Sequence, residues 1–209
     1  MMDPIAHFRS LYEGLYDEPP IGLEASRIAL AEARLGVALP DTLRGFHLAL
    51  GGEEDLLGSH NRVRRPEEIT LVDARLIFME ENQGGHVWAV SPGHGDPKVE
   101  VGTVEGSKVQ SWHPDGTHLC AFLEVTVHLH TAWGGFPYGA THRDPDAILG
   151  RLKGGGWTRR VAHGGVHVFA QRSVLLWWND GGDHVSANAR DEEDVTWLVS
   201  EWGFDDPFA

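Results

Sequence analysis

The chain has 209 residues, of which 41% are hydrophobic, and this supplies enough apolar side chains for a packed core. It carries 31 Asp and Glu against 17 Lys and Arg, and the formal charge of -14 argues against sequence-independent binding to nucleic acid or to an anionic membrane surface. The composition excludes a disordered chain. It favours a folded acidic protein, whose charge either attracts a basic protein partner or only maintains solubility.

The number of cysteines indicates the cellular compartment in which the protein is expected. Cys120 has no partner in the chain for a disulfide, so a reducing compartment is expected, and its apolar surroundings HLCAFL predict that it is buried. No apolar run approaches the roughly 18 residues of a membrane span. The first residues, which include Asp3, His7, Arg9 and Glu13, lack the order of a signal peptide. We therefore expect a cytoplasmic protein.

The first third of the chain predicts helices. Residues 5–16 place their apolar side chains on one helical face. In the next helix Ile28, Ala31 and Leu35 recur at i, i+3 and i+7, and Gly36 stands where a left-handed C-cap is needed.

A third helix is predicted to begin at Pro40, because the fixed φ of proline suits a first helical turn. Its apolar residues Leu43, Phe46 and Leu50 repeat the same spacing. The pair Gly51 and Gly52 ends it.

The middle of the chain predicts a sheet. A polar turn follows the glycine pair, and residues 61–72 around Pro66 are expected to be irregular and to lead to an edge strand or a short helix. The segments RLIFMEE, HVWAVSP and KVEVGTV, separated by turn residues at 82–85 and 93–97, predict a meander, and VQSWHP adds a fourth strand. Residues 115–116 are expected to turn the chain into a closing helix over 119–133.

A linker rich in Gly and Pro at 134–139 predicts a domain boundary near residue 140. The expected units are an N-terminal domain, 1–135, and a C-terminal extension, 140–209. The extension is predicted to contain a helix capped at 144–146, the strands WTRRVAH, VHVFAQR and SVLLWWN with a turn at 164–165, and a final helix over 190–202. The predicted fold class is α+β: N-terminal helices packed on a mainly antiparallel sheet, followed by an α-βββ-α extension.

This order of elements resembles the SUKH superfamily, the Smi-Knr family of cell-wall assembly regulators, in which a helix runs through an LG-x-x-LP turn into a second helix and an NGG-like glycine pair. Leu50 stands where the family usually carries a small polar residue. The resemblance covers roughly residues 20–135. The matching residues are Leu35, Gly36, Leu39, Pro40, Phe46, Gly51 and Gly52, followed by Ile77, Phe78, Gly85, Val87, Trp88, Asp96, Pro97, Lys98, Val99, Trp112, Phe122 and Leu123.

What the resemblance implies is protein binding without catalysis. Bacterial members of the family are typically immunity proteins that bind and neutralise a cognate toxin, often a nuclease, whereas fungal members regulate cell-wall synthesis through protein contacts. The first hypothesis is therefore an immunity protein whose acidic face covers a basic toxin. A regulatory scaffold without a toxin partner is the alternative, and a metal-dependent hydrolase that uses histidines is a third.

Two acidic clusters and one aromatic residue are candidates for the binding surface. One cluster follows the third predicted helix and the other ends the first strand of the meander, so both could border one surface that attracts a basic protein. A tryptophan beside two glycines is a candidate aromatic anchor. The candidate partner-binding residues are Glu53, Glu54, Asp55, Glu80, Glu81 and Trp133.

Patterns typical of catalytic and metal sites are not found in the sequence. On the predicted helix His128 and His130 point about 200° apart, and a glycine turn separates His163 from His167. No HExxH motif or phosphate-binding loop is present, and Cys120 is expected to be buried. The sequence therefore predicts no catalytic residue, no metal site and no cofactor.

Overall fold

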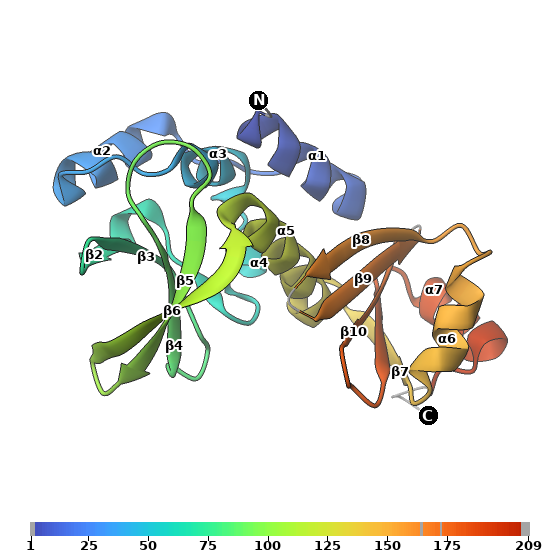
Figure 1. The fold of residues 1–209 in the computed structure, drawn as a ribbon. Helices are drawn as coiled ribbons and strands as arrows, with labels where there is room; N and C mark the ends of the chain where they lie inside the picture. The colour runs from blue at the N-terminus through green and yellow to red at the C-terminus, as the bar shows by residue number, and fades with distance from the viewer. Residues whose placement is uncertain (1–2, 164, 172, 206–209) are drawn as a thin grey trace. The chain divides into compact units, whose positions relative to one another are not determined.

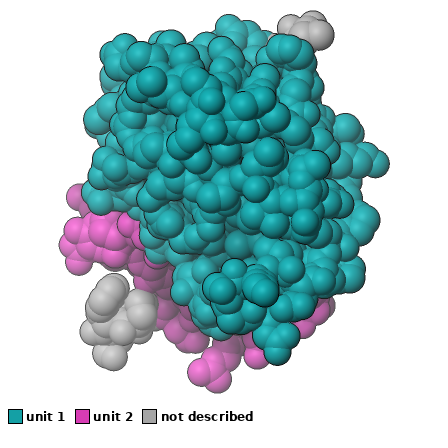
Figure 2. Space-filling model, turned by 90° about the vertical axis from the view of Figure 1, so that its left-hand side faces the viewer, with its two compact units in different colours: residues 1–130 teal, residues 131–209 magenta. Residues whose placement is uncertain are grey.

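The computed structural model describes residues 3–163, 165–171 and 173–205 (Figure 1). The chain forms two compact units, unit 1 (1–130) and unit 2 (131–209), which are coloured separately in Figure 2. Each unit combines helices with an antiparallel sheet, and this confirms the α+β class. None of the helices formed by the described residues has the length and apolar character needed to cross a membrane.

The three predicted N-terminal helices are present. They are α1 (Pro4–Tyr16), α2 (Ala25–Leu35) and α3 (Asp41–Leu50), and Figure 1 shows them in blue on one side of unit 1. Gly36 adopts φ 70°, the left-handed conformation predicted for the C-cap of α2, and its N–H donates to the carbonyl of Glu32.

A glycine allows α1 to pack closely on α3. A Cβ added at Gly45 would lie 2.5 Å from the Cβ of Pro4, so any side chain there would push the helices apart. The approach brings the buried rings of Phe8 and Phe46 into edge-to-face contact, with centroids 5.0 Å apart. These rings belong to the core of unit 1.

Among the described residues, six strands form the sheet of unit 1, in the order β1-β3-β4-β5-β6 with β2 also paired to β3. All pairs are antiparallel, so the predicted meander and its fourth strand are confirmed. The strands are β1 (Arg62–Val63), β2 (Thr70–Val72), β3 (Arg75–Glu80), β4 (His86–Val90), β5 (Lys98–Glu105) and β6 (Lys108–His118).

Three local predictions in unit 1 need correction. The expected polar turn after the glycine pair is a short helix, α4 (Glu54–Gly58), which forms because Leu56 and Leu57 turn inward and are buried. Residues 115–116 do not end the strand, because the chain passes through an irregularity in the β5–β6 register and β6 continues to His118. The closing helix α5 (Leu119–His130) is shorter than predicted and continues as a π-helical turn, η2 (Thr131–Gly135).

Unit 2 has more strands than the predicted extension. Among its described residues, five antiparallel strands lie in the order β7-β11-β10-β9-β8, together with two α-helices and two π-helical segments, of which η2 is the first. The elements are β7 (Tyr138–His142), α6 (Pro145–Leu152), β8 (Thr158–His163), β9 (Val166–Gln171), β10 (Val174–Asn179), β11 (Val185–Ala189), α7 (Glu192–Trp197) and η3 (Leu198–Trp202).

Two strands of unit 2, β7 and β11, were not predicted from the sequence. The first lies where a linker was predicted, and its pairing with β11 makes residues 138–142 part of the second sheet. Both strands are short and contain small residues such as Gly139 and Ser186, which give a weak strand signal. Of the turn predicted at 164–165, residue 164 lies outside the described residues.

Candidate functional site

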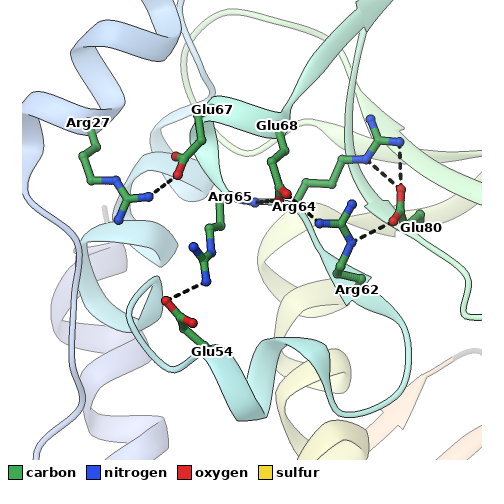
Figure 3. Close-up of polar contacts among 8 residues, drawn as sticks. All are labelled: Arg27, Glu54, Arg62, Arg64, Arg65, Glu67, Glu68 and Glu80. Atoms are coloured by element: carbon green, nitrogen blue, oxygen red, sulfur yellow. Dashed lines mark hydrogen bonds and ion pairs between the residues drawn. The ribbon is translucent and has the colours of Figure 1, made fainter.

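Charged side chains of opposite sign interlock on unit 1 where α2, α4, β1, β3 and a 3-10 turn, η1 (Pro66–Glu68), meet (Figure 3). Pro66 sits at the first position of η1, where its missing N–H costs nothing. The turn therefore presents its two carboxylates beside the arginines that precede it. We call this set the Arg–Glu network: Arg27, Glu54, Arg62, Arg64, Arg65, Glu67, Glu68 and Glu80.

Glu80, the last residue of β3, is the centre of the network. Arg62 lies opposite Glu80 in the β1–β3 register, and its Nε is 2.7 Å from Oε1 of Glu80. Arg64 lies two residues after Arg62 in the chain. It donates from Nε and Nη2 to Oε2 of Glu80, at 3.1 and 2.9 Å. Arg62 also donates from Nη1 to Glu68, at 2.7 Å, so the strand pair and η1 are tied together.

Two further ion pairs connect the network to helices. Arg65 Nη2 lies 2.6 Å from Oε1 of Glu54, which joins η1 to α4. Arg27 of α2 pairs with Glu67 of η1. Figure 3 shows both pairs to the left of the group around Glu80. The network thus fixes four segments that are separate in sequence.

The network holds the carboxylates of Glu68 and Glu80 in the ionised form. Burial raises the pKa of Glu80, but hydrogen bonds from Arg62 and Arg64 outweigh burial and lower it overall. The pKa of Glu68 is likewise lowered despite burial, through the Arg65 N–H and Arg62. Arginine also stays protonated, so neither the arginines nor these two glutamates gain or lose a proton near neutral pH. The arrangement is suited to recognition rather than to acid–base chemistry.

A cavity of about 310 Å³ opens among these side chains, and its charged lining residues are Glu54, Arg62, Arg64, Arg65 and Glu68. His47 of α3 also lines it and is 1% exposed. Neither ring nitrogen of His47 has a hydrogen-bond partner among the described residues. Burial lowers the pKa of His47 to about 4, so the ring is neutral at physiological pH.

The structure brings together some of the predicted site residues but not all of them. Glu54 and Glu80 both belong to the network, so one residue of each predicted acidic cluster takes part in it. Asp55 is exposed on α4. Both predicted carboxylates in the network are, however, paired with arginines, so the surface is mixed in charge rather than acidic.

Glu53 and Glu81 have structural contacts. Glu53 accepts a hydrogen bond from the hydroxyl of Tyr12, at 3.1 Å, and another from the backbone N–H of Ile21. Glu81 accepts from the N–H of Gly85, at 3.0 Å, and pairs with His86, so it fixes the turn between β3 and β4. Substituting either residue would disturb the fold as well as the surface.

Trp133 belongs to unit 2. It is 37% exposed, and its ring meets Trp177 edge to face with centroids 5.6 Å apart. Both rings line an open groove of about 320 Å³, to which Thr141, Ser186 and Asn188 contribute polar side chains. The groove is a feature of the second sheet, separate from the Arg–Glu network.

The arginines of the site were missed in the sequence, although their tract RVRRPEE contains most of the network. A basic stretch followed across a proline by acidic residues was a usable signal, because opposite charges close together in the chain can pair with one another. Searches against protein-family models, curated proteins and solved structures found no match to the chain. The chemistry of these side chains is therefore the basis for assigning a role.

Proposed function

We propose that this chain is a non-catalytic protein-binding module, and specifically an immunity protein that binds and neutralises a cognate toxin with a basic surface. The observation that carries the proposal is the Arg–Glu network, in which mutual ion pairs hold charged groups in position before a partner arrives. Side chains already held in place lose less conformational entropy on binding. Their fixed pattern of charge favours one complementary partner over others.

The charge of unit 1 supports a basic partner. Residues 1–130 contain 20 Asp and Glu against 10 Lys and Arg, a net charge of -10. The network itself is balanced, so the excess negative charge comes from the surface around it, including the exposed Asp55 at its edge. The negative electrostatic potential of this surface increases the rate at which a basic protein associates.

Apolar contacts are available beside the network. Leu30 of α2 is 71% exposed and lines a shallow groove together with Arg27, Arg34 and Glu67. An exposed leucine next to an ordered ion pair combines the apolar and polar contacts found in protein interfaces. Unit 1 therefore offers both kinds of contact on neighbouring elements.

The SUKH resemblance of residues 20–135 supports the immunity role within this class. Unit 1 has the element order on which that resemblance was based: two helices, a glycine pair, a meander and a closing helix. A single cysteine fits the cytoplasm, where an immunity protein would meet a toxin nuclease. The proposal thus includes a cytoplasmic location.

The test is capture of a partner by the tagged protein from its source cells and from the products of adjacent genes, at low and high salt. A single one-to-one partner with toxic activity, bound more weakly at high salt, is expected. Several weak partners with little salt dependence would contradict the immunity role and favour a regulatory scaffold.

Charge reversal then locates the surface. In Glu54→Lys/Asp55→Lys we expect the association rate at low salt to fall by about tenfold, with a smaller effect at high salt. Glu53 is left unchanged because it bonds to Tyr12 and Ile21. Asp183→Lys, in unit 2 with a side chain 95% exposed, is the control for reversing one charge outside this surface. Equal rates for the double variant and the control would overturn this choice of surface.

A further inference from the structure

A second cluster in unit 1 lies between α1 and α5 and is separate from the Arg–Glu network. His7 comes from α1, whereas Cys120 and Glu124 come from α5. Cys120 and Glu124 are four residues apart and therefore lie on one face of their helix. A ligand atom from each of the three residues lies within 4.8 Å of the others.

The contact between His7 and Glu124 has the distance of an ion pair but not the geometry of a hydrogen bond. Nε2 of His7 lies 2.5 Å from Oε1 of Glu124. Nevertheless, Nε2 is buried and makes no aligned hydrogen bond to any described residue. A buried polar atom without such a bond needs a physical explanation. Two ligand atoms on one tetrahedral Zn²⁺ lie roughly 3.3 Å apart, so Nε2 and Oε1 have to separate slightly to admit an ion, which would then satisfy both atoms.

The surroundings of the thiol are negatively charged. Cys120 is 9% exposed, and the carboxylates of Glu124 and Asp96 both act on its thiol. Asp96 is held beside it, because its Oδ1 accepts both the N–H of Cys120 at 2.8 Å and the hydroxyl of Thr42 at 3.1 Å. A cation would offset this concentration of negative charge.

We propose that His7, Cys120 and Glu124 bind a divalent transition-metal ion, with Zn²⁺ the best match. Imidazole, thiolate and carboxylate are all zinc ligands, and three protein ligands leave a fourth position for water. A thiolate disfavours Mg²⁺ and Ca²⁺, which prefer oxygen ligands. Binding converts the Cys120 thiol to a thiolate bonded to the metal and releases its proton to solvent.

The ion would connect the N-terminal helix to the helix that closes unit 1. Binding to the folded state alone stabilises that state by mass action, so the melting temperature of unit 1 should rise with free Zn²⁺. This inference does not rest on the proposed binding function. The sequence did not reveal the cluster because its ligands lie on two helices far apart in the chain.

Cobalt provides the test, because a Co²⁺–thiolate bond gives a charge-transfer band in the near ultraviolet and Cys120 is the only cysteine. Chelator-treated full-length protein is titrated with Co²⁺ and then with Zn²⁺. We expect one equivalent of Co²⁺ to produce the band, Zn²⁺ to abolish it, and Zn²⁺ to raise the melting temperature. No band, with no Zn²⁺ bound at about 100 μM, would overturn the proposal.

Variants assign the ligands. Cys120→Ser should lose the band, and His7→Gln should weaken Zn²⁺ binding by at least about 100-fold. His94→Gln, whose side chain is 85% exposed, is the control for the remaining histidines. Circular dichroism of the metal-free variants checks that each folds; if Cys120→Ser does not, His7→Gln decides. Unchanged Zn²⁺ affinity in folded His7→Gln would show that the ion binds elsewhere and would contradict the assignment.

Discussion

The two units of this chain use different side chains for their tertiary contacts. In unit 1 ion pairs join separate segments, as in the Arg–Glu network, and the unit carries most of the net charge. Unit 2 contains six of the eight tryptophans, and several of its tertiary contacts join aromatic rings. Trp202, for example, lies 5.6 Å from Trp157 and 5.7 Å from Trp197, measured between ring centroids.

This difference bears on where binding occurs. Ring contacts bury apolar area and respond little to salt, so they stabilise a unit without adding a charge pattern at its surface. Ion pairs at partly exposed positions add little stability but fix where charges lie. Unit 1 therefore has the features of a recognition surface, whereas the aromatic residues of unit 2 mainly stabilise the fold of that unit.

The largest expected effect of a single substitution is in the aromatic cluster of unit 2. Trp178 is 7% exposed and stacks on Phe169 and His167, with centroids 5.4 and 5.1 Å away. Trp178→Ala should lower the free energy of unfolding of unit 2 by about 3–5 kcal/mol, because it removes a large buried ring and leaves a cavity. Hydrogen exchange measured by mass spectrometry would follow β9 and β10 separately from unit 1.

The same experiment tests whether the units are distinct in stability. Trp133→Ala, at a half-exposed ring in the same unit, is the matched control and should cost much less. Equal loss of exchange protection in α1 and α3 of the Trp178→Ala variant would contradict the comparison, because it would mean that the two units unfold together.

A pH effect of intermediate size is expected in unit 1. Burial lowers the pKa of His47 and of His130 to about 4, whereas the unfolded chain titrates near 6.5. The pKa of each histidine is lower in the folded than in the unfolded chain. The stability that these two neutral rings contribute is therefore fully present above pH 6.5 and is lost as pH falls towards 4. Each histidine should contribute on the order of 3 kcal/mol of this loss.

Substitution of His47 tests its share of this pH dependence. Urea unfolding of unit 1 between pH 7 and 4 should show a shallower pH dependence in His47→Phe than in the unsubstituted protein. Exposed His94 is the control, and His94→Gln should leave the slope unchanged. An unchanged slope in folded His47→Phe would show that His47 is not the buried neutral group inferred here.

The elements that the sequence predicted are those with local signals. Helix α2 has an apolar repeat and a glycine cap within a dozen residues, and the meander has its turn residues between strands. Helix α4 has five residues, too few for a periodic signal, and it forms because Leu56 and Leu57 pack inward. β7 and β11 depend on their mutual pairing, which no local pattern encodes.

The candidate site was predictable to the extent that acidic residues cluster along the chain. Glu54 and Glu80 were identified in this way, but their arginine partners come from other segments. The order of ion pairs depends on the β1–β3 register, which places Arg62 opposite Glu80. Charge clustering thus indicated the location, and only the tertiary structure showed that the surface is balanced in charge.

The smallest predicted effect is at the centre of the Arg–Glu network. Glu80→Gln leaves Arg62 and Arg64 without their shared carboxylate and should cost about 1 kcal/mol, less at high salt, because the groups are partly exposed. Glu100→Gln, which breaks the isolated pair with Arg75 in the same sheet, is the matched control.

A double-mutant cycle tests whether the network is cooperative. If it is, the coupling between Arg62 and Glu80 should shrink when Arg64 is also replaced. Coupling that is independent of Arg64 would mean that the pairs act singly, and unit 1 would then lack the ordered charge pattern that distinguishes it from unit 2.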